Sequence, residues 1–344
     1  MRYLITGGAG FIGCNYADRL LSRGEKVVVF DNLSRAGSED NLSWLWKRHN
    51  GDHDILHHDM NDVCDFPAVC NAVRTADVVV HLAAQTAVTA SIEEPGRDFC
   101  TNAIGTVNVL EAARQAGHFP VVLYASTNKV YGAMDDEEVT EIATRYVYRS
   151  HSMGIAESQP LDFHSPYGCS KGAGDQYAHD YARIYGLPTV VFRQSCIYGP
   201  RQMGVEDQGW LAWFMIAAVT GQPITIYGDG KQVRDVLYID DLLDLYDVAI
   251  ARIDTVGAGQ VYNVGGGPSH TISVWEELAP RLEMLLGRKV DVSFSDWRSG
   301  DQRVYISDIR KATQHFDWRP RVDVDTGIHR LYEFVKRFVK RGGV

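Results

Sequence analysis

The chain has 344 residues, of which 45% are hydrophobic and 23% charged, and it carries a formal net charge of −10. This composition is typical of a globular protein with a sizeable core. The acidic balance argues against an extended nucleic-acid or anionic-membrane surface, because such surfaces are usually basic. The chain opens on a strand pattern without a signal peptide, and no apolar run is long enough to span a bilayer. We therefore expect neither a nucleic-acid nor a membrane partner.

The first part of the chain alternates short apolar runs with longer helical patterns. Strands this rich in valine and isoleucine are typical of a parallel sheet that is covered on both faces. Their alternation with helices predicts a doubly wound, Rossmann-type α/β fold. The runs lie at residues 3–6, 26–31, 54–58, 77–82, 121–126 and 189–193.

The rhythm of the chain changes after about residue 194. Short strand candidates at 224–227, 290–294 and 304–306 mix with helices such as 273–286. This mixture indicates a smaller C-terminal α/β region.

Two later segments, 235–239 and 261–264, are expected to return to the large sheet. The expected division is residues 1–194 with returning segments near 235–265 for the large domain, and residues 195–234 with 266–344 for the smaller region.

The cysteines and histidines give no sign of a disulfide framework or a metal site. The six cysteines contain no Cys-x-x-Cys pair, and the histidines, including the neighbours His57 and His58, show no ligand spacing. We expect no metal, thiols that remain reduced, and a cytoplasmic location.

A glycine-rich turn follows the first expected strand. Residues 6–13 read TGGAGFIG and lead directly into a helical pattern. Such glycines allow a tight turn and let the backbone approach a pyrophosphate at the helix N-terminus. Asp31 ends the second expected strand, where a carboxylate binds the ribose diol of the adenosine. A carboxylate there repels a 2′-phosphate and favours NAD over NADP, although the nearby Arg35 leaves NADP open.

Other residues follow the later strands at positions that fit the same site. Asp59 follows the third strand, where it would meet the adenine end of the cofactor. Ala83 and Ala84 follow the fourth strand, where small side chains let a cofactor lie against the sheet edge. Asn102 stands at an expected helix start. Each of these residues, taken alone, is more often a packing or capping residue.

A long helix is predicted in the middle of the chain. Ser165 and Pro166 are typical of a helix start, with serine as the N-cap and proline at the first helical position. The helix is predicted to end at Tyr185, because Gly186 and Pro188 follow it.

Tyr167 and Lys171 lie four residues apart on this helix and therefore share one face. A tyrosine is a poor base at neutral pH, but an ammonium group and a positive nicotinamide beside it would both lower its pKa. Thr127 ends the fifth expected strand and would hydrogen-bond the same substrate hydroxyl. We expect these three residues to form a catalytic triad, although Tyr-x-x-x-Lys alone is usually a helix surface pair.

Taken together, these residues resemble the extended short-chain dehydrogenase/reductase family, which comprises NAD-dependent epimerases and dehydratases. The resemblance covers nearly the whole length of the chain. Within this family the chain is most similar to the CDP-paratose (CDP-tyvelose) 2-epimerases. The resemblance implies an isomerase that holds NAD tightly, oxidises carbon 2 of a nucleotide-linked hexose and returns the hydride to the other face. The resembling segments are DNLSRAGSEDNLSWL (31–45), STNKVYG (126–132), LDFHSPYGCSKG (161–172), DQGW (207–210) and GKQVRDVL (230–237).

The resemblance also implies which residues form the site. The cofactor-binding residues would be Gly7, Gly10, Phe11, Ile12, Gly13, Asp31, Asn32, Arg35, Asp59, Met60, Leu82, Ala83, Ala84, Asn102, Tyr167 and Lys171. The catalytic residues would be Thr127, Tyr167 and Lys171, and the substrate-binding residues Thr127, Asn128, Lys129, His164, Gln208, Arg234 and Arg298.

The residues after Thr127 argue against sugar dehydration. A 4,6-dehydratase of this family needs an acid and a base there, in the pattern Thr-Asp-Glu, and Asn128 and Lys129 supply neither. We expect them to hydrogen-bond the sugar, with a strand-end cap and a solvent-exposed lysine as the alternative. Cys196 stands where many relatives have asparagine, and we interpret it as a buried thiol without a chemical role.

The C-terminal region is expected to bind the nucleotide diphosphate. Arg234 and Arg298 match family positions that contact the diphosphate, and a guanidinium can bind phosphate oxygens with two parallel hydrogen bonds. Gln208 and Trp210 would shape the sugar or base pocket, although core packing is nearly as good an explanation for Trp210. His164 would line the pocket.

Several alternatives stay open. The reaction could be 4-epimerisation, and the chain could be a non-catalytic NAD-sensing regulator, although such regulators typically lose the tyrosine or the lysine that this chain keeps. The nucleotide base is open, as is the choice between a 3,6-dideoxyhexose and glucose/mannose. By resemblance we expect a homodimer or homotetramer formed through the helices at 103–116 and 166–185.

Overall fold

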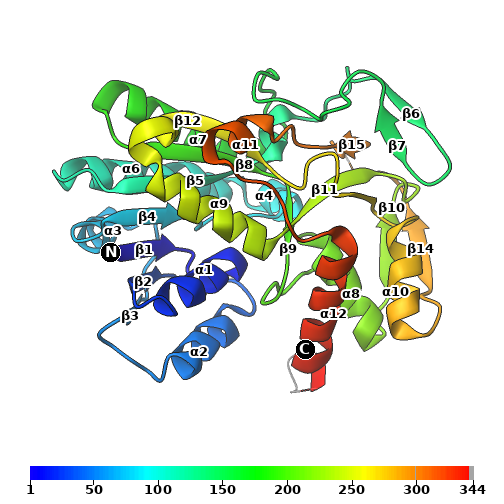
Figure 1. Ribbon diagram of the computed structural model, residues 1–344, viewed down its shortest axis with the longest axis horizontal. Coiled ribbons are helices and arrows are strands. Elements are labelled where there is room, and N and C mark those ends of the chain that lie inside the picture. Colours follow the sequence, from blue (N-terminus) through cyan, green and yellow to red (C-terminus); the bar gives the residue numbers. More distant parts are fainter. Residues whose placement is uncertain (299, 341–344) are drawn as a thin grey trace. The chain divides into compact units, whose positions relative to one another are not determined.

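The computed structural model describes residues 1–298 and 300–340, and Figure 1 traces its elements along the chain. Its contacts divide the chain into two compact units. The first unit comprises Met1–Val130, Ser165–Arg193 and Leu243–Tyr262, and the second comprises Tyr131–His164, Gln194–Leu242 and the chain from Asn263 onward.

The first unit is built on a seven-stranded sheet in the order β12-β8-β5-β4-β1-β2-β3. Neighbouring strands from β5 to β3 are parallel, and the order 3-2-1-4-5 is that of a doubly wound fold. The predicted fold class is therefore confirmed. The strands are β1 (Arg2–Thr6), β2 (Lys26–Phe30), β3 (Leu56–Asp59), β4 (Val78–His81), β5 (Val121–Thr127), β8 (Thr189–Gln194) and β12 (Gln260–Val264).

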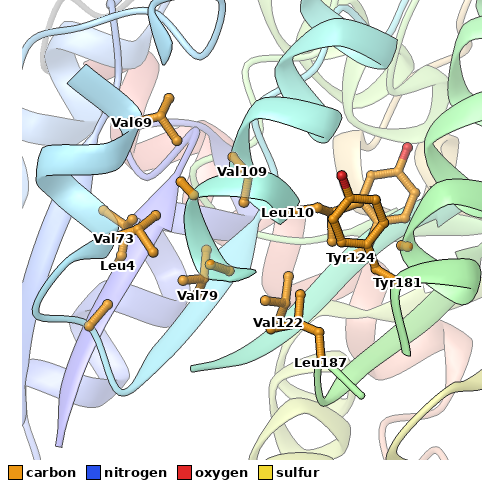
Figure 2. Packing of buried hydrophobic residues seen from close by; sticks show 14 of the residues in the cluster. Leu4, Val69, Val73, Val79, Val109, Leu110, Val122, Tyr124, Tyr181 and Leu187 are labelled. Carbon is orange, nitrogen blue, oxygen red and sulfur yellow. The ribbon is translucent and has the colours of Figure 1, made fainter. Parts of the chain in front are cut away.

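One helix layer packs its apolar side chains onto the central strands. In Figure 2, valine and leucine side chains of α3 and α6 meet those of β1, β4 and β5. Burial of this kind is the main favourable contribution to folding. The labelled residues of this cluster are Leu4, Val69, Val73, Val79, Val109, Leu110, Val122, Tyr124, Tyr181 and Leu187.

A second helix layer is formed by α1, α2 and α9. The ring of Tyr16 on α1 packs edge-on against Tyr246 on α9, with centroids 5.5 Å apart. Arg19 binds Asp244 at 2.7 Å in the same contact. The helices of the first unit are α1 (Phe11–Leu21), α2 (Ser38–Arg48), α3 (Phe66–Val73), α4 (Val88–Glu93), α5 (Pro95–Phe99), the π-helix η1 (Cys100–Ile104), α6 (Gly105–Gln115), α7 (Ser165–Tyr185), α9 (Ile239–Ala251) and the π-helix η3 (Ile253–Gly257).

Helix α7 has the predicted bounds. Ser165 caps its start by accepting a hydrogen bond on Oγ from the Gly168 amide at 3.3 Å. The helix ends at Tyr185, and Gly186 follows it with a φ of 71°. This left-handed conformation favours glycine and stops the helix.

Among the residues that the structure describes, the second unit contains three small sheets. Strand β11 pairs with β9, β13 and β15, strand β10 pairs with β14, and β6 pairs with β7. The strands are β6 (Val139–Glu141), β7 (Tyr146–Tyr148), β9 (Cys196–Tyr198), β10 (Ile224–Tyr227), β11 (Val233–Tyr238), β13 (Thr271–Ser273), β14 (Val292–Ser295) and β15 (Val304–Tyr305). The helices are η2 (Asn128–Tyr131), which begins in the first unit, α8 (Trp210–Thr220), α10 (Leu278–Leu286), α11 (Arg310–Phe316) and α12 (Val324–Lys340).

The prediction that residues 235–239 return to the large sheet is wrong, whereas 261–264 do join it as part of β12. The reason is a fully buried carboxylate in β11. Asp235 Oδ2 accepts hydrogen bonds from the amides of Gly267 and Ser307, each at 3.1 Å. Because a buried carboxylate needs such donors, these bonds hold β11 in the second unit.

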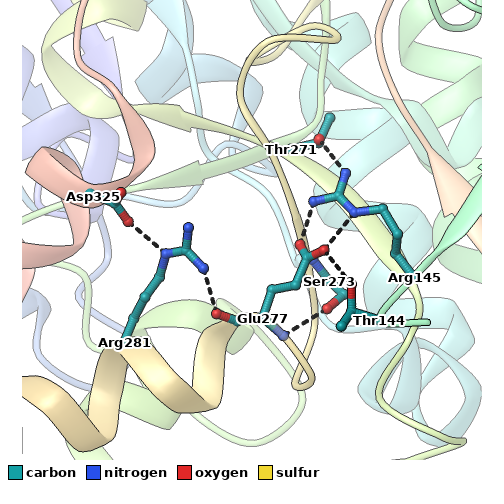
Figure 3. A network of polar contacts seen from close by, with 7 residues as sticks. All are labelled: Thr144, Arg145, Thr271, Ser273, Glu277, Arg281 and Asp325. Atoms are coloured by element: carbon teal, nitrogen blue, oxygen red, sulfur yellow. Dashed lines mark hydrogen bonds and ion pairs between the residues drawn. The ribbon is translucent and has the colours of Figure 1, made fainter. Parts of the chain in front are cut away.

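The expected division placed residues 131–164 in the large domain. In the structure they lie in the second unit. Figure 3 shows the polar network that holds this excursion. Arg145 donates to Glu277 Oε1 at 2.6 Å and to Thr271 Oγ1 at 2.8 Å, and it also forms an ion pair with Glu277 Oε2. Thr144 donates to Glu277 Oε1 at 2.9 Å. These long-range bonds connect the β6–β7 hairpin to β13 and α10.

We expect Glu277→Gln to lower the free energy of unfolding by about 2 kcal/mol at neutral pH, because it removes the charge that Arg145 binds. Burial alone would raise the pKa of Glu277, but the bonds from Arg145 outweigh it and hold the pKa below its usual range. This contribution is complete above the unfolded pKa of about 4.3 and is lost as the pH falls through the lower folded value. Urea unfolding of both proteins at neutral pH and at about pH 3 measures the difference.

The control for this prediction is Glu94→Gln, which removes an exposed pair with Arg97. Exposed pairs contribute little, so this change should lower stability by less than about 1 kcal/mol. A Glu277 variant as stable as the Glu94 variant at neutral pH would contradict the proposed role of the network.

Candidate active site

The turn between β1 and α1 leaves no room for a side chain at Gly7 or Gly13. Gly7 has a φ of 68°, and a Cβ there would lie 2.7 Å from the amide nitrogen of Ala83. A Cβ on Gly13 would lie 2.6 Å from Gly8 Cα. Gly10 is the N-cap of α1 and offers no side-chain oxygen to the first helical amides. The amides that begin with Phe11 and Ile12 therefore point their partial positive charge at a space that a pyrophosphate fits.

Asp31 stands directly after β2, beside this turn. Its Oδ2 accepts a hydrogen bond from the Ala9 amide at 2.9 Å and its Oδ1 accepts one from the Leu33 amide at 2.8 Å. Burial raises the pKa of Asp31, and these backbone bonds oppose the rise. The carboxylate is thus fixed at the sheet edge, where a ribose diol would donate to it. Arg35 is exposed and donates to Thr86 Oγ1 at 2.8 Å.

The loops after β2 and β3 are tied to each other. Asn32 donates from Nδ2 to Asp62 Oδ2 at 2.8 Å, and Asn61 donates to the Asp59 carboxylate. Met60 is 67% exposed between them, which makes its side chain available to cover an adenine ring. After β4, the partly exposed segment Leu82–Ala84 follows on the same edge, and its Ala83 amide donates to Thr6 Oγ1 at 3.3 Å.

Asn102 is fully buried on η1, where its side chain braces neighbouring elements. Its Oδ1 accepts from the Gln85 amide at 2.9 Å, and its Nδ2 donates to Gln85 O at 3.0 Å and to Ser170 Oγ at 3.1 Å. Asp98, which is 1% exposed, accepts from Ser170 and from Asn102. This network joins α5 and η1 to α7. Sequence reasoning missed Asp98 and Ser170, because nothing in the local pattern marks either residue.

Thr127, Tyr167 and Lys171 come together at the carboxyl end of β5. All three side chains are buried, at 8%, 8% and 4% exposure. Tyr167 and Thr127 share a hydrogen bond. The Lys171 Nζ donates to Ala125 O at 2.7 Å and lies 4.4 Å from the centre of the Tyr124 ring. The structure therefore brings the three predicted catalytic residues into one cluster.

Burial dominates the titration of this cluster. Burial is the largest influence on the pKa of Tyr167 and raises it to about 12, although the neighbouring hydrogen bond with Thr127 lowers it. Burial lowers the pKa of Lys171 to about 7, although the negative charges of Asp175 and Asp98 raise it.

Asp175 is a further residue that sequence reasoning missed. It is fully buried one helical turn beyond Lys171 and binds Arg193 of β8 through two hydrogen bonds of 2.8 and 2.9 Å. Ser126 of β5 donates to the same carboxylate at 2.6 Å. These contacts lock the position of α7 on the sheet. A spacing of four residues from the lysine was a possible signal, but an i, i+4 pair on a helix is common.

The two residues after Thr127 begin the short helix η2. Asn128 is 9% exposed and accepts from Thr127 Oγ1 on its Oδ1 at 3.4 Å. Lys129 is partly exposed, and its amide donates to Thr127 Oγ1 at 3.3 Å. Both residues therefore stay next to the threonine and place no carboxylate there.

Three of the predicted substrate residues of the second unit have contacts with one another's chain neighbours or with charged partners. Arg234 is 7% exposed on β11 and binds Asp301 at 2.7 Å. Arg298 binds Asp207, the neighbour of Gln208, at 3.0 Å and lies 4.0 Å from the centre of the Tyr227 ring. A Cβ on Gly300 would lie 4.0 Å from His164 Nδ1. These contacts place Arg234 beside Asp301, Arg298 beside Asp207, and His164 near Gly300.

Trp210 and Cys196 contact each other in the second unit. Trp210 packs edge-on against Phe214 with centroids 6.0 Å apart, and its indole N–H donates to Cys196 Sγ at 3.3 Å. Cys196 is partly exposed rather than buried as expected.

Among the described residues, no group of three or more histidine, cysteine, aspartate and glutamate side chains could hold a metal ion. No helix in the described part of the chain is both long enough and apolar enough to cross a membrane.

Comparison with known proteins gives matches over almost the whole chain. The model of the NAD dependent epimerase/dehydratase family matches residues 3–265. The chain is 44% identical over 341 residues to the CDP-paratose 2-epimerase of Salmonella typhi, which covers 97% of this chain and 99% of that protein. It is 32% identical over 342 residues to the UDP-glucose 4-epimerase of Mycolicibacterium smegmatis, with 98% and 99% covered.

Solved structures agree with this result. The UDP-glucose 4-epimerase of Thermus thermophilus, in complex with NAD, has a TM-score of 0.80 at 31% identity and covers 100% of both chains. A dTDP-glucose 4,6-dehydratase of Streptomyces venezuelae, with NAD bound, has a TM-score of 0.84 at 30% identity and covers 99% of this chain and 98% of that chain.

The predicted family and the predicted cofactor, NAD, are therefore confirmed. The glycine turn, the open end of α1 and the fixed carboxylate of Asp31 form a cradle that suits this dinucleotide. The chain belongs to the NAD dependent epimerase/dehydratase family.

Proposed function

We propose that the protein is an NAD-dependent isomerase that inverts carbon 2 of a nucleotide-linked hexose, with a CDP-sugar of the paratose/tyvelose type as substrate. The observation that carries this proposal is the identity of 44% with a CDP-paratose 2-epimerase over nearly the full length of both proteins. The relatives that are 4-epimerases or dehydratases stand at 30–33% identity.

The residues after Thr127 support epimerisation over dehydration. Loss of a sugar hydroxyl needs a proton donor for the leaving oxygen and a base for the neighbouring carbon. Asn128 and Lys129 occupy the positions next to the threonine, and neither carries a carboxylate. Both can donate hydrogen bonds to a sugar that keeps its hydroxyl groups.

Tyr167 is the proposed acid/base residue. When bound, NAD takes up a hydride from the sugar carbon and later returns it. The Tyr167 oxygen, as the phenolate that Lys171 and a positive nicotinamide would favour, would take the proton of the sugar hydroxyl as the ketone forms and give it back when the hydroxyl is restored. Thr127 orients this hydroxyl, and Lys171, whose pKa burial lowers to about 7, can hold or release a proton near neutral pH.

The second unit is proposed to hold the nucleotide diphosphate through Arg234 and Arg298. Each guanidinium already binds one carboxylate, Asp301 and Asp207 respectively. A guanidinium has five N–H donors, so it can bind phosphate oxygens as well. Anchoring at the diphosphate would leave the keto-sugar able to turn between the two hydride transfers.

We also propose a homodimer or homotetramer in the cytoplasm. Large apolar side chains are exposed on the helices from α4 to α7, and an assembly would cover them. They are Ile92, Phe99, Ile104, Ile184 and Tyr185. The six cysteines contain no Cys-x-x-Cys pair or metal-ligand spacing, which favours free thiols in a reducing compartment. Light scattering would measure the mass of the assembly.

The reaction is tested by incubating the purified protein, without added cofactor, with CDP-paratose and with CDP-, GDP- and UDP-linked glucose. We expect proton NMR to show inversion at carbon 2, fastest with a CDP-sugar, because the protein carries its own NAD. Inversion at carbon 4 would overturn the proposed position of attack. No conversion of any sugar by protein that holds NAD would favour the regulator hypothesis.

We expect Tyr167→Phe to lower kcat by about 10³-fold, since it removes the oxygen that transfers the proton. The NAD content, measured after denaturation, should stay unchanged. The matched control is Tyr177→Phe, which changes an exposed tyrosine of the same helix and should leave kcat as it is. If Tyr167→Phe kept its kcat, another residue would be the acid/base.

We expect Gly13→Ala to lose most of its bound NAD, because its Cβ would lie 2.6 Å from Gly8 Cα and push the turn apart. Gly96→Ala is the control, since a Cβ at Gly96 meets no atom within 4 Å. Chromatography of the cofactor released by denaturation measures the content, and circular dichroism checks the fold. A Gly13 variant with a full complement of NAD would contradict the placement of the pyrophosphate.

A further inference from the structure

Two cysteines of the first unit lie in direct contact. Cys64 follows β3 in the chain, and Cys100 begins η1, 36 positions later. Their Sγ atoms are 2.8 Å apart, and both side chains are partly exposed. A disulfide has a sulfur–sulfur distance of about 2.05 Å, so a small movement would join them.

The contact is fixed by the segments around it. The Val63 carbonyl, next to Cys64, accepts a hydrogen bond from Asn108 Nδ2 of α6 at 2.9 Å. A Cβ on Gly105, where α6 begins, would lie 2.6 Å from Val63 Cγ2, so the loop lies closely against the helix. The Cys64 amide donates to Asp62 Oδ1 at 2.9 Å. These bonds hold the loop against η1 and α6, and they keep the two sulfurs together.

We propose that Cys64 and Cys100 are a reversible disulfide site, which small disulfides such as oxidised glutathione oxidise. The cross-link would tie the loop after β3 to η1. Asp62, two residues from Cys64, binds Asn32, and Asn102 lies two residues after Cys100. Because Asn32, Asp59, Met60 and Asn102 are among the expected cofactor residues, the cross-link fixes two segments that enclose the NAD site.

The chemistry balances without any further reactant. The Cys100 sulfur, as thiolate, attacks one sulfur of the small disulfide, forms a mixed disulfide and releases one small thiolate. Cys64 then attacks the Cys100 sulfur, the second small thiolate leaves, and the protons of the two cysteines end on the two small thiols. The two cysteines are oxidised and the small disulfide is reduced. Burial raises the pKa of Cys64 well above its usual range, which makes Cys64 the poorer nucleophile, so the first attack is assigned to Cys100.

The cross-link should stabilise the protein and retain its cofactor. It closes a loop of the chain between Cys64 and Cys100, which restricts the unfolded state. The sulfurs need little movement, so the folded state should remain undistorted. We expect the melting temperature to rise by about 5 °C and the release of NAD to become slower. This inference depends on where NAD binds but not on which sugar is converted.

The test treats the NAD-loaded protein with oxidised glutathione. We expect the intact mass to fall by two hydrogen atoms, peptide mapping to join Cys64 to Cys100, and dithiothreitol to reverse both changes. Cys64→Ser and Cys100→Ser should each abolish the rise in melting temperature and the slower release of NAD. Cys70→Ser, which changes another partly exposed cysteine, should preserve both effects.

Two results would overturn the proposal. One is a stable glutathione adduct on Cys100 with no link to Cys64, and the other is an unchanged pair of thiols after oxidation of the exposed Cys169. A cross-link that formed without slowing the release of NAD would overturn the link to the cofactor. None of these readouts uses sugar turnover, so they are independent of the test of the proposed reaction.

Discussion

The buried ion pair between Asp175 and Arg193 is the contact on which the catalytic cluster depends. Both side chains are almost inaccessible, and two parallel hydrogen bonds connect them. Removal of one partner would leave an uncompensated charge inside the protein, which is strongly unfavourable. Ser126 adds a third bond from β5. The pair thus fixes the rotation and the position of α7, which carries both Tyr167 and Lys171.

A second buried carboxylate, Asp98, fixes the start of the same helix through Ser170. On α7, Lys171 lies between Ser170, which binds Asp98, and Asp175. Both carboxylates attract the positive charge of the lysine. Burial opposes them and is the larger effect, so the pKa falls to about 7. The carboxylates therefore have two roles that cannot be separated: they hold the helix in place, and they keep the lysine from losing its proton entirely at neutral pH.

What the sequence could predict depended on local chemistry. The bounds of α7 follow from a serine that caps one end and a glycine that ends the other, and the structure has both. The glycine turn and the carboxylate after β2 were equally visible, because a strand, a turn and a helix adjoin in the chain. The fold class followed from apolar strands that alternate with helices.

The predictions failed where contacts between residues far apart in the sequence determine the position of a segment or a side chain. The segment 235–239 has the apolar pattern of a central strand, and nothing in it shows that Gly267 and Ser307 would hold Asp235 elsewhere. Residues 131–164 interrupt the first unit because Arg145 finds Glu277 far along the chain. Asp98 and Asp175 were missed for the same reason, since their partners come from η1, α7, β5 and β8.

The proposed diphosphate site would let an acidic protein bind an anion through two arginines of the second unit. With a net charge of −10, attraction at long range does not favour a diphosphate, so local donors must hold it. Arg234 is nearly buried, and its bond to Asp301 fixes the direction of its guanidinium. Arg298 is more exposed, and water screens its bond to Asp207, so this partner is easily exchanged for phosphate. In the proposed diphosphate site, a fixed arginine and an exchangeable one would together select a ligand by the geometry of its oxygens more than by its charge.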